Sequence, residues 1–142
     1  MTVPSAAATL PLVAVGGAVG ALVRWGLIEA AGGGAAVLAC NVVGSLILGV
    51  LVGSMPRPGT MMSADEWARR FGRQRLLGTG FCGGLTTLST VAVDAAGRLD
   101  DGRPGAAVAG LATTVALTGI AGAVGVLAAR RSRPGADSAI VR

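Results

Sequence analysis

Three residue types that carry much of protein chemistry are absent from this 142-residue chain: lysine, histidine and tyrosine. Without histidine, the two cysteines, Cys40 and Cys82, are too few to build the usual zinc sites. Both cysteines fall in apolar stretches, so we interpret them as small buried hydrophobes. The sequence has no Walker, nucleophile or paired-carboxylate motif, and we therefore expect that the protein is not an enzyme.

Charge is also scarce, at 13% of residues, whereas a soluble domain carries about 25%. Hydrophobic residues make up 52% of the chain, and the mean hydropathy is +0.69. We predict an all-α membrane protein, with a transmembrane domain over residues 1–129 and a polar, disordered tail over residues 130–142. Four apolar runs are long enough to cross a hydrocarbon core of about 30 Å, namely Leu10–Ile28, Ala35–Met55, Leu76–Ala96 and Ala106–Ala129.

Glycine is abundant, with 24 residues, many of them inside the predicted spans. In membranes, small residues let helices approach closely, because packing rather than hydrophobic exclusion drives helix association. Gly16 and Gly20 have the spacing that such helix contacts use, and Gly44, Gly49, Gly119 and Gly122 lie within later spans. We expect most of these glycines to serve tight helix packing.

The third run carries a polar interruption at its centre. Two adjacent glycines, Gly83 and Gly84, are followed by four hydroxyl residues: Thr86, Thr87, Ser89 and Thr90. Glycine weakens a helix, and carbonyls freed at mid-membrane must be buried in protein or line a polar path. We therefore predict a third helix broken at mid-membrane, as part of an ion pathway. Any one of these hydroxyls is also explained by a hydrogen bond to its own helix.

Arginine supplies all of the positive charge outside the N-terminus, and its distribution predicts an orientation. With four spans, both termini and the second connection share one side, and the opposite side holds Arg98 and Arg103. The positive-inside rule places both termini in the cytoplasm of a protein of the cell membrane. Residues 65–71 are either a short interfacial helix, with Trp67 and Phe71 toward lipid, or a charged loop. The terminal side holds nine arginines: Arg57, Arg69, Arg70, Arg73, Arg75, Arg130, Arg131, Arg133 and Arg142.

Two further polar residues lie inside predicted spans and need an explanation. Asn41, near the start of the second span, offers an NH₂ group that can solvate an anion or bond to a neighbouring helix. Arg24, four residues from the end of the first span, either snorkels to the interface or attracts anions to a vestibule. Asp94, one turn beyond Thr90, is interpreted as a charge at the interface.

Three stretches in order resemble the motifs of the CrcB/Fluc fluoride channels. Residues 16–25, GGAVGALVRW, are similar to the first-helix pattern GGxxGAxxRY/W. Residues 41–49, NVVGSLILG, are similar to NxxGSFxLG, and residues 80–91, GFCGGLTTLSTV, to GFxGGxTTFSTF. Chain length and the number of spans also agree, so the resemblance covers nearly all of the chain through Ala129.

The resemblance implies an antiparallel, dual-topology type of dimer of four-helix subunits that exports fluoride passively. It also implies a structural sodium ion at the dimer centre, held by the backbone carbonyls of Gly83 and Thr86. Arg24 then belongs to a vestibule. The pore-lining positions carried over from the family are Asn41, Ser89, Thr90, Leu88 and Val91.

The chain departs from the family pattern at aromatic positions. Leu88 and Val91 stand where the family has pore phenylalanines, and neither offers a polarised ring edge to an anion. The family's fourth-helix tyrosine is also missing, with Thr113, Thr114 and Thr118 as the nearby hydroxyls. Together with the arginine bias, these losses favour a heterodimer with an oppositely oriented homologue.

Two alternatives stay open. The first is a non-conducting partner subunit of a heterodimeric channel, since the pore aromatics are lost. The other alternative is a small multidrug-type antiporter, which has a similar length and span count. That mechanism needs a membrane carboxylate, and the first span has none before Glu29 at its end. Aromatic residues to bind a lipophilic cation are also scarce, at 3%.

Overall fold

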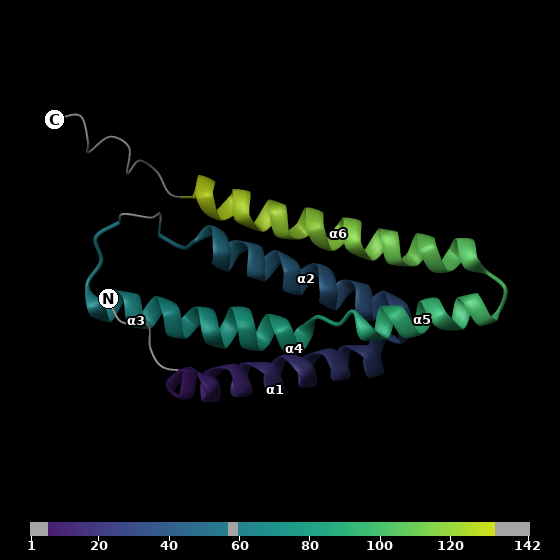
Figure 1. Cartoon of the computed structure of the whole chain (residues 1–142), viewed down its shortest axis with the longest axis horizontal. Coiled ribbons are helices and arrows are strands. Elements are labelled where there is room, and N and C mark those ends of the chain that lie inside the picture. The colour runs from purple at the N-terminus through teal and green to yellow at the C-terminus, as the bar shows by residue number, and fades with distance from the viewer. Residues whose placement is uncertain (1–5, 57–59, 133–142) are drawn as a thin grey trace.

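The computed structural model describes residues 6–56 and 60–132 of the chain. Helix follows helix throughout this part, and Figure 1 labels most of the elements. Residues 74–82 are wound as a π-helix, a rare and wider form, inside an otherwise continuous helical rod. The elements are α1 (Ala6–Ala31), α2 (Gly33–Gly53), α3 (Ala64–Arg73), η1 (Gln74–Cys82), α4 (Gly83–Leu85), α5 (Ser89–Asp100) and α6 (Pro104–Arg131).

Four helical stretches of the described chain are long and apolar enough to cross a membrane, which confirms the predicted number. The third stretch, Ala64–Asp100, begins 12 residues before the predicted span, because the charged residues ahead of Leu76 are helical as well. Helix α6 continues through Arg131, two residues into the segment predicted as a tail. Residues 133–142 of that predicted tail lie outside the described residues.

Successive spans run in opposite directions, and in Figure 1 they are stacked from top to bottom in the order α6, α2, the third span and α1. The start of α1, the connection between α2 and α3, and the end of α6 all lie at one end of the molecule. We call this the terminal end, and the other the distal end. At the distal end a single non-helical residue, Gly32, links α1 to α2, and its φ of 73° suits a residue without a Cβ.

Glycine lets the helices pack in two pairs, α1 against η1 and α4, and α2 against α6. A Cβ on Gly20 would collide with the Phe81 carbonyl, and one on Gly49 with the Gly122 carbonyl. These contacts confirm the interpretation of the glycines as packing residues, except at Gly119, where a Cβ would meet nothing within 4 Å. The two pairs touch each other less extensively, mainly through α2 with α1 and η1, and α5 packs against α6.

Many large apolar side chains point outward from this arrangement. Trp25 on α1, Val93 on α5 and Ile120 on α6 each keep at least 60% of their surface exposed. Exposing so much apolar surface to water is unfavourable, whereas lipid tails or a second membrane-embedded chain would cover it.

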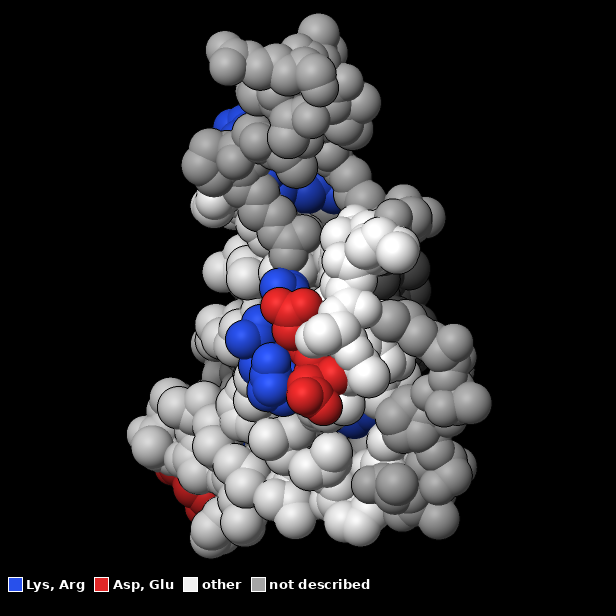
Figure 2. All heavy atoms as spheres, turned by 90° about the vertical axis from the view of Figure 1, so that its left-hand side faces the viewer, with Lys and Arg blue, Asp and Glu red and all other residues white. Residues whose placement is uncertain are grey.

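The segment interpreted either as an interfacial helix or as a loop is helix α3. Ser63 and Glu66 form a capping box at its start, in which the Glu66 N–H donates to Ser63 Oγ at 3.2 Å. Along it, the rings of Trp67 and Phe71 stack at 5.9 Å between centroids, and the Arg75 guanidinium lies 4.8 Å from the Phe71 ring. Figure 2 views the terminal end, where acidic and basic side chains lie side by side.

Candidate functional site

The third span is interrupted at residues 86–88, between α4 and α5. Thr86 is extended, with φ −84° and ψ 150°, and Leu88 returns to the helical region before α5 starts. The predicted break is therefore present, but the glycines do not form it. Gly83 and Gly84 are both helical, and Gly84 instead lets α4 approach the Gly17 carbonyl of α1.

Asn41 of α2 holds the break open. Its Oδ1 accepts the Thr87 N–H at 2.7 Å, and its Nδ2 donates to the Thr87 carbonyl at 2.9 Å. In an unbroken helix, the Thr87 N–H would donate to the carbonyl of Gly83 four residues earlier. The Asn41 side chain therefore replaces a helical hydrogen bond, and it does so while 4% exposed. The contact is an interhelical bond, as one of the two interpretations of Asn41 predicted.

Arg24 of α1 reaches the same break from the other side. Its Nη1 donates to the Thr86 carbonyl at 3.1 Å, so the guanidinium ends at the break. A cation beside the last carbonyls of a helix is favourable, because these carbonyls are the negative end of the helix dipole. Residues from α1 and α2 thus donate hydrogen bonds to two carbonyls at the break, those of Thr86 and Thr87.

The Thr87 hydroxyl caps the beginning of α5. It shares hydrogen bonds with the hydroxyls of Ser89 at 2.9 Å and Thr90 at 3.4 Å, and it accepts the Thr90 N–H at 3.4 Å. Ser89 and Thr90 are exposed and joined to each other through Thr87. The sequence assigned Ser89 and Thr90 to the pore but not Thr87, which lies at their centre.

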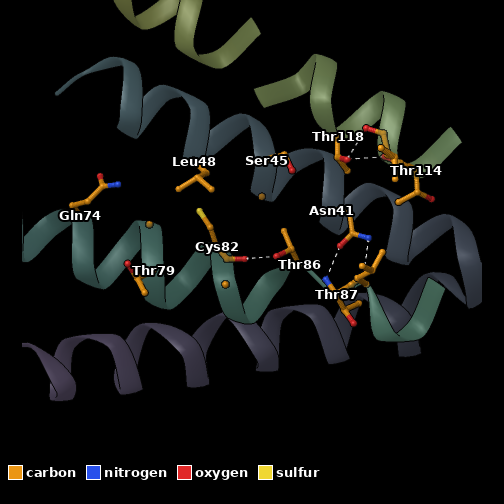
Figure 3. A pocket seen from close by; sticks show the side chains of 15 residues that line it. Asn41, Ser45, Leu48, Gln74, Thr79, Cys82, Thr86, Thr87, Thr114 and Thr118 are labelled. Atoms are coloured by element: carbon orange, nitrogen blue, oxygen red, sulfur yellow. Dashed lines mark hydrogen bonds between the residues drawn. The ribbon is translucent and has the colours of Figure 1, made fainter. Parts of the chain in front are cut away.

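A groove with a volume of about 470 Å³ lies between α2, α6 and the third span, next to the break (Figure 3). Of the predicted site residues, Asn41, Leu88, Gly83 and Thr86 line it. None of the described residues that line it carries a charge. The other lining residues are Gly44, Ser45, Leu48, Gln74, Gly78, Thr79, Cys82, Thr87, Thr114, Val115 and Thr118.

The threonines of this groove differ from its amides in what they offer an anion. Thr86 donates its hydroxyl to the Cys82 carbonyl at 2.9 Å, Thr114 to the Gly110 carbonyl at 3.0 Å, and Thr118 to the Thr114 carbonyl at 2.7 Å. Each of these three hydroxyls donates its one hydrogen to a carbonyl of its own helix, so only its lone pairs remain for a ligand in the groove. The Asn41 NH₂ group has two hydrogens and uses one on Thr87, so a second donor remains.

Gln74 is a second amide in the groove, which sequence reasoning missed because it lies just outside the predicted span. It stands at the end of the groove nearest the terminal end in Figure 3. Gly78 leaves it room, because a Cβ there would lie 3.0 Å from Gln74 Nε2. An uncharged polar residue between two arginines, Arg73 and Arg75, just ahead of an apolar run is the signal that would have found it.

The remaining predicted pore residues lie elsewhere. Thr90 and Val91 line a second cavity near the distal end, and Ser89 lines neither this cavity nor the groove. Among the described residues, no cluster of three or more His, Cys, Asp or Glu side chains could hold a metal ion.

Comparisons with known proteins agree with one another. Residues 11–126 match the family model described as CrcB-like protein, Camphor Resistance (CrcB). The chain is 42% identical over 119 residues to fluoride-specific ion channel FluC 2 of Halobacterium salinarum, covering 84% of this chain and 81% of the relative. It is 37% identical over 99 residues to FluC 1 of the same organism, covering 68% and 72%. It is 36% identical over 111 residues to FluC of Pseudomonas aeruginosa, covering 72% and 79%.

Proposed function

The chain belongs to the CrcB-like family of fluoride-specific ion channels, and from this premise we propose that it is a channel subunit through which fluoride leaves the cell passively. Such channels are not enzymes, and family membership sets aside the antiporter alternative. The chain is a multi-pass membrane protein, and the cell membrane is the location that passive export requires.

The observation that carries this proposal is the uncharged groove with Asn41 at the helix break. A dehydrated fluoride ion needs hydrogen-bond donors and no carboxylate nearby, and the groove offers amide N–H groups and no charged side chain among the described residues. Asn41 is held in place by Thr87 through one donor and one acceptor, which leaves its second N–H for an anion. Rigid donors favour an ion of one size over larger halides.

We place both termini in the cytoplasm. The terminal end carries Arg69, Arg70, Arg73, Arg75, Arg130 and Arg131 among the described residues, against two acidic side chains, Asp65 and Glu66. The distal end carries Arg98 and Arg103 against four acidic side chains: Glu29, Asp94, Asp100 and Asp101. This asymmetry supports one fixed orientation. Reporter fusions at the C-terminus, active only in the cytoplasm or only outside it, check the assignment.

A fixed orientation supports a heterodimer with an oppositely oriented homologue. The groove side of the break is open in one protomer, with Leu88 64% exposed. Two family members bearing the numbers 1 and 2 occur together in Halobacterium salinarum, a pairing that a two-gene channel would use. Leu88 and Val91 supply no aromatic edge, so the second chain would contribute the aromatic groups. By the same reasoning, a non-conducting partner role for this chain is the second candidate.

We also propose that a sodium ion binds to the carbonyls of Gly83 and Thr86. Asn41 has taken the Thr87 N–H, which frees the Gly83 carbonyl from its helical partner, and a Cβ on Gly83 would meet nothing within 4 Å. Neutral carbonyl oxygens suit a hard monovalent cation. The Thr86 carbonyl already accepts from Arg24, so its second lone pair would bind the ion. Two carbonyls from one chain leave room for an equal contribution by a second subunit.

The channel and the heterodimer are tested together by fluoride efflux from liposomes. The chain is reconstituted alone and together with its neighbouring homologue, and external fluoride is followed with an electrode, with chloride as the control ion. We expect efflux from the pair and little from the single chain. Full efflux from the single chain would contradict the heterodimer, and no efflux from either preparation would contradict the channel.

The sodium ion is tested separately by its effect on stability. A ligand that binds only the folded assembly raises its stability by mass action. We expect the thermal unfolding midpoint of the purified channel to fall when sodium is replaced by N-methylglucamine. An unchanged midpoint over a wide range of sodium concentrations would count against the ion without touching the channel assignment.

A further inference from the structure

A second cavity, of about 700 Å³, lies at the distal end, between the start of α2 and helices α5 and α6. Its wall includes Thr90 and Val91, which the sequence assigned to the pore. Of the described residues that line it, Asp94 and Arg98 carry charge, and the others are apolar or small or bear a hydroxyl. The cavity therefore joins predicted pore residues to one ion pair.

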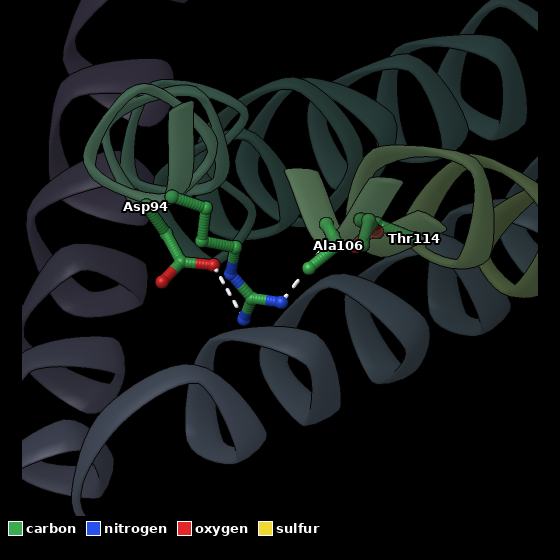
Figure 4. A network of polar contacts seen from close by, with 5 residues as sticks. Asp94, Ala106 and Thr114 are labelled. Atoms are coloured by element: carbon green, nitrogen blue, oxygen red, sulfur yellow. Dashed lines mark hydrogen bonds and ion pairs between the residues drawn. The ribbon is translucent and has the colours of Figure 1, made fainter. Parts of the chain in front are cut away.

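The pair is held in a defined position (Figure 4). Arg98 Nη2 lies 2.9 Å from Asp94 Oδ2, one turn earlier on α5. Arg98 Nη1 donates to the Ala106 carbonyl of α6 at 3.4 Å. Gly110 leaves space for the guanidinium, since a Cβ there would lie 3.7 Å from Nη1. The guanidinium thus bridges α5 and α6 at the cavity wall.

The charges of this pair act on the cavity more strongly than those of an ordinary surface pair. Walls of low polarity focus the field of a charge into the space they enclose. The guanidinium has five N–H groups, and its two printed contacts leave others for a ligand. Arg98 is 38% exposed at its side chain and Asp94 is 53% exposed, so both are accessible to an ion in the cavity.

We propose that this cavity is an anion vestibule at the distal end, in which Arg98 supplies positive charge and donors and Asp94 weakens the attraction enough for release. The proposal rests on the proposed channel function. Conduction requires a site that attracts an ion and then lets it leave. A lone arginine would hold a small anion firmly, whereas a paired arginine keeps the orientation of its donors and loses much of the net charge.

The test uses fluoride efflux from the preparation that conducts, the single chain or the pair of homologues. Arg98→Gln leaves the Asp94 carboxylate alone in the vestibule, and we expect efflux to fall by about tenfold, at the lower end of electrostatic focusing effects. Arg98→Lys keeps the charge, and we expect efflux within about twofold of wild type. The double variant Asp94→Asn/Arg98→Gln is uncharged, and it recovers most of the efflux lost in Arg98→Gln.

Arg103→Gln is the matched control, because it removes one arginine from the same end without touching the cavity lining. We expect no change from it. The deficit of Arg98→Gln also shrinks as salt is raised, because salt screens the exposed carboxylate. A bridge between α5 and α6 that is only structural would make the double variant as poor as Arg98→Gln, and this result overturns the proposal.

The outcomes separate the two levels of inference. Efflux from wild type with no rescue in the double variant, or an equal loss in Arg103→Gln, refutes the vestibule and leaves the channel standing. Absence of fluoride efflux from wild type in both preparations refutes the channel, and the vestibule with it. Size-exclusion profiles of each variant in detergent establish that a loss of efflux is not a loss of folding.

Discussion

The two sides of the helix break differ in how completely one protomer fills them. On the side facing α1 and α2, Arg24 donates a hydrogen bond to the Thr86 carbonyl, and Asn41 donates one to the Thr87 carbonyl. Toward the groove, Gly83 and Leu88 are exposed, and Leu88 keeps 64% of its surface open. On the side facing α1 and α2, the hydrogen bonds of the break are made within the chain. On the groove side, there is room for a second chain or an ion.

This difference between the two sides of the break separates the shape of the break from the chemistry of the groove. The shape of the break depends on hydrogen bonds inside the protomer, and these stay in place whether or not a second chain is present. The chemistry of the groove depends on which groups face Leu88 and Gly83 across it. Variants on the side facing α1 and α2 should therefore damage folding and function together, and variants on the groove side should change function alone.

The largest effect is expected for Asn41→Ala. It leaves the N–H and the carbonyl of Thr87 without partners in a site poor in water, where each unsatisfied group costs about 1–3 kcal/mol. We expect the free energy of unfolding to drop by about 2–5 kcal/mol, and fluoride efflux to vanish. Thermal unfolding in detergent and liposome efflux measure the two effects.

Ser45→Ala is the matched control for that variant. Ser45 lies one turn further along α2, lines the same groove, and has no hydrogen bond within the described residues. We expect its stability to be near that of wild type. If the Asn41→Ala protein were as stable as the Ser45→Ala protein, the claim that the Asn41 hydrogen bonds stabilise the break would be contradicted.

A smaller loss is expected for Gly20→Ala. The added Cβ would collide with the Phe81 carbonyl and lie 2.8 Å from the Leu85 nitrogen, so α1 must move away from η1 and α4. Overpacking of this kind costs about 1–3 kcal/mol. Gly26→Ala, on the same helix with nothing within 4 Å, controls for the change in helix propensity and should not destabilise the protein. Equal unfolding midpoints for the two variants would show that α1 does not depend on this contact.

The smallest effect on stability is expected for a substitution on the groove side of the break. Leu88→Phe restores an aromatic ring at an exposed position, so the free energy of unfolding should stay within about 0.5 kcal/mol of wild type. We expect efflux from the single chain to rise by up to about tenfold, in line with the energy of an aromatic edge contact. Leu99→Phe, on α5 but lining neither cavity, is the control. No rise in efflux would assign the missing chemistry to a residue other than Leu88.

Sequence patterns predicted the parts of this structure that depend on local composition. The four spans follow from apolar runs, and the break was predicted in the right segment, although Gly83 and Gly84, on which that prediction relied, are helical. The contact between Arg24 and Thr86 joins residues 62 apart, and the contact between Asn41 and Thr87 joins residues 46 apart. No local pattern specifies such distances, so the roles of Arg24 and Thr87 at the break were not foreseen.

The groove shows the same limit. It depends on which faces of α2, η1 and α6 turn toward one another, and the π-helical winding of residues 74–82 shifts those faces relative to an α-helix. Gln74 and Thr79 therefore enter the groove, while Thr90 and Val91, which were predicted to line the pore, line the distal cavity instead. Family motifs name residues but do not fix the rotation of each helix.

The capping box at Ser63 fixes the residue at which the third span begins, and so fixes how far along the span each later residue lies. The rod from Ala64 to Leu85 starts at a fixed point, and each residue along it adds length and rotation, about 1.5 Å and about 100° where the winding is α-helical. Inserting or deleting one residue between the cap and Thr86 would change the depth of the Gly83 carbonyl and swing it away from the groove. A change of length is therefore tolerable in the connection between the end of α2 and Ser63, but not in α1 or α2, which carry Arg24 and Asn41, and not in the 22 residues of Ala64–Leu85.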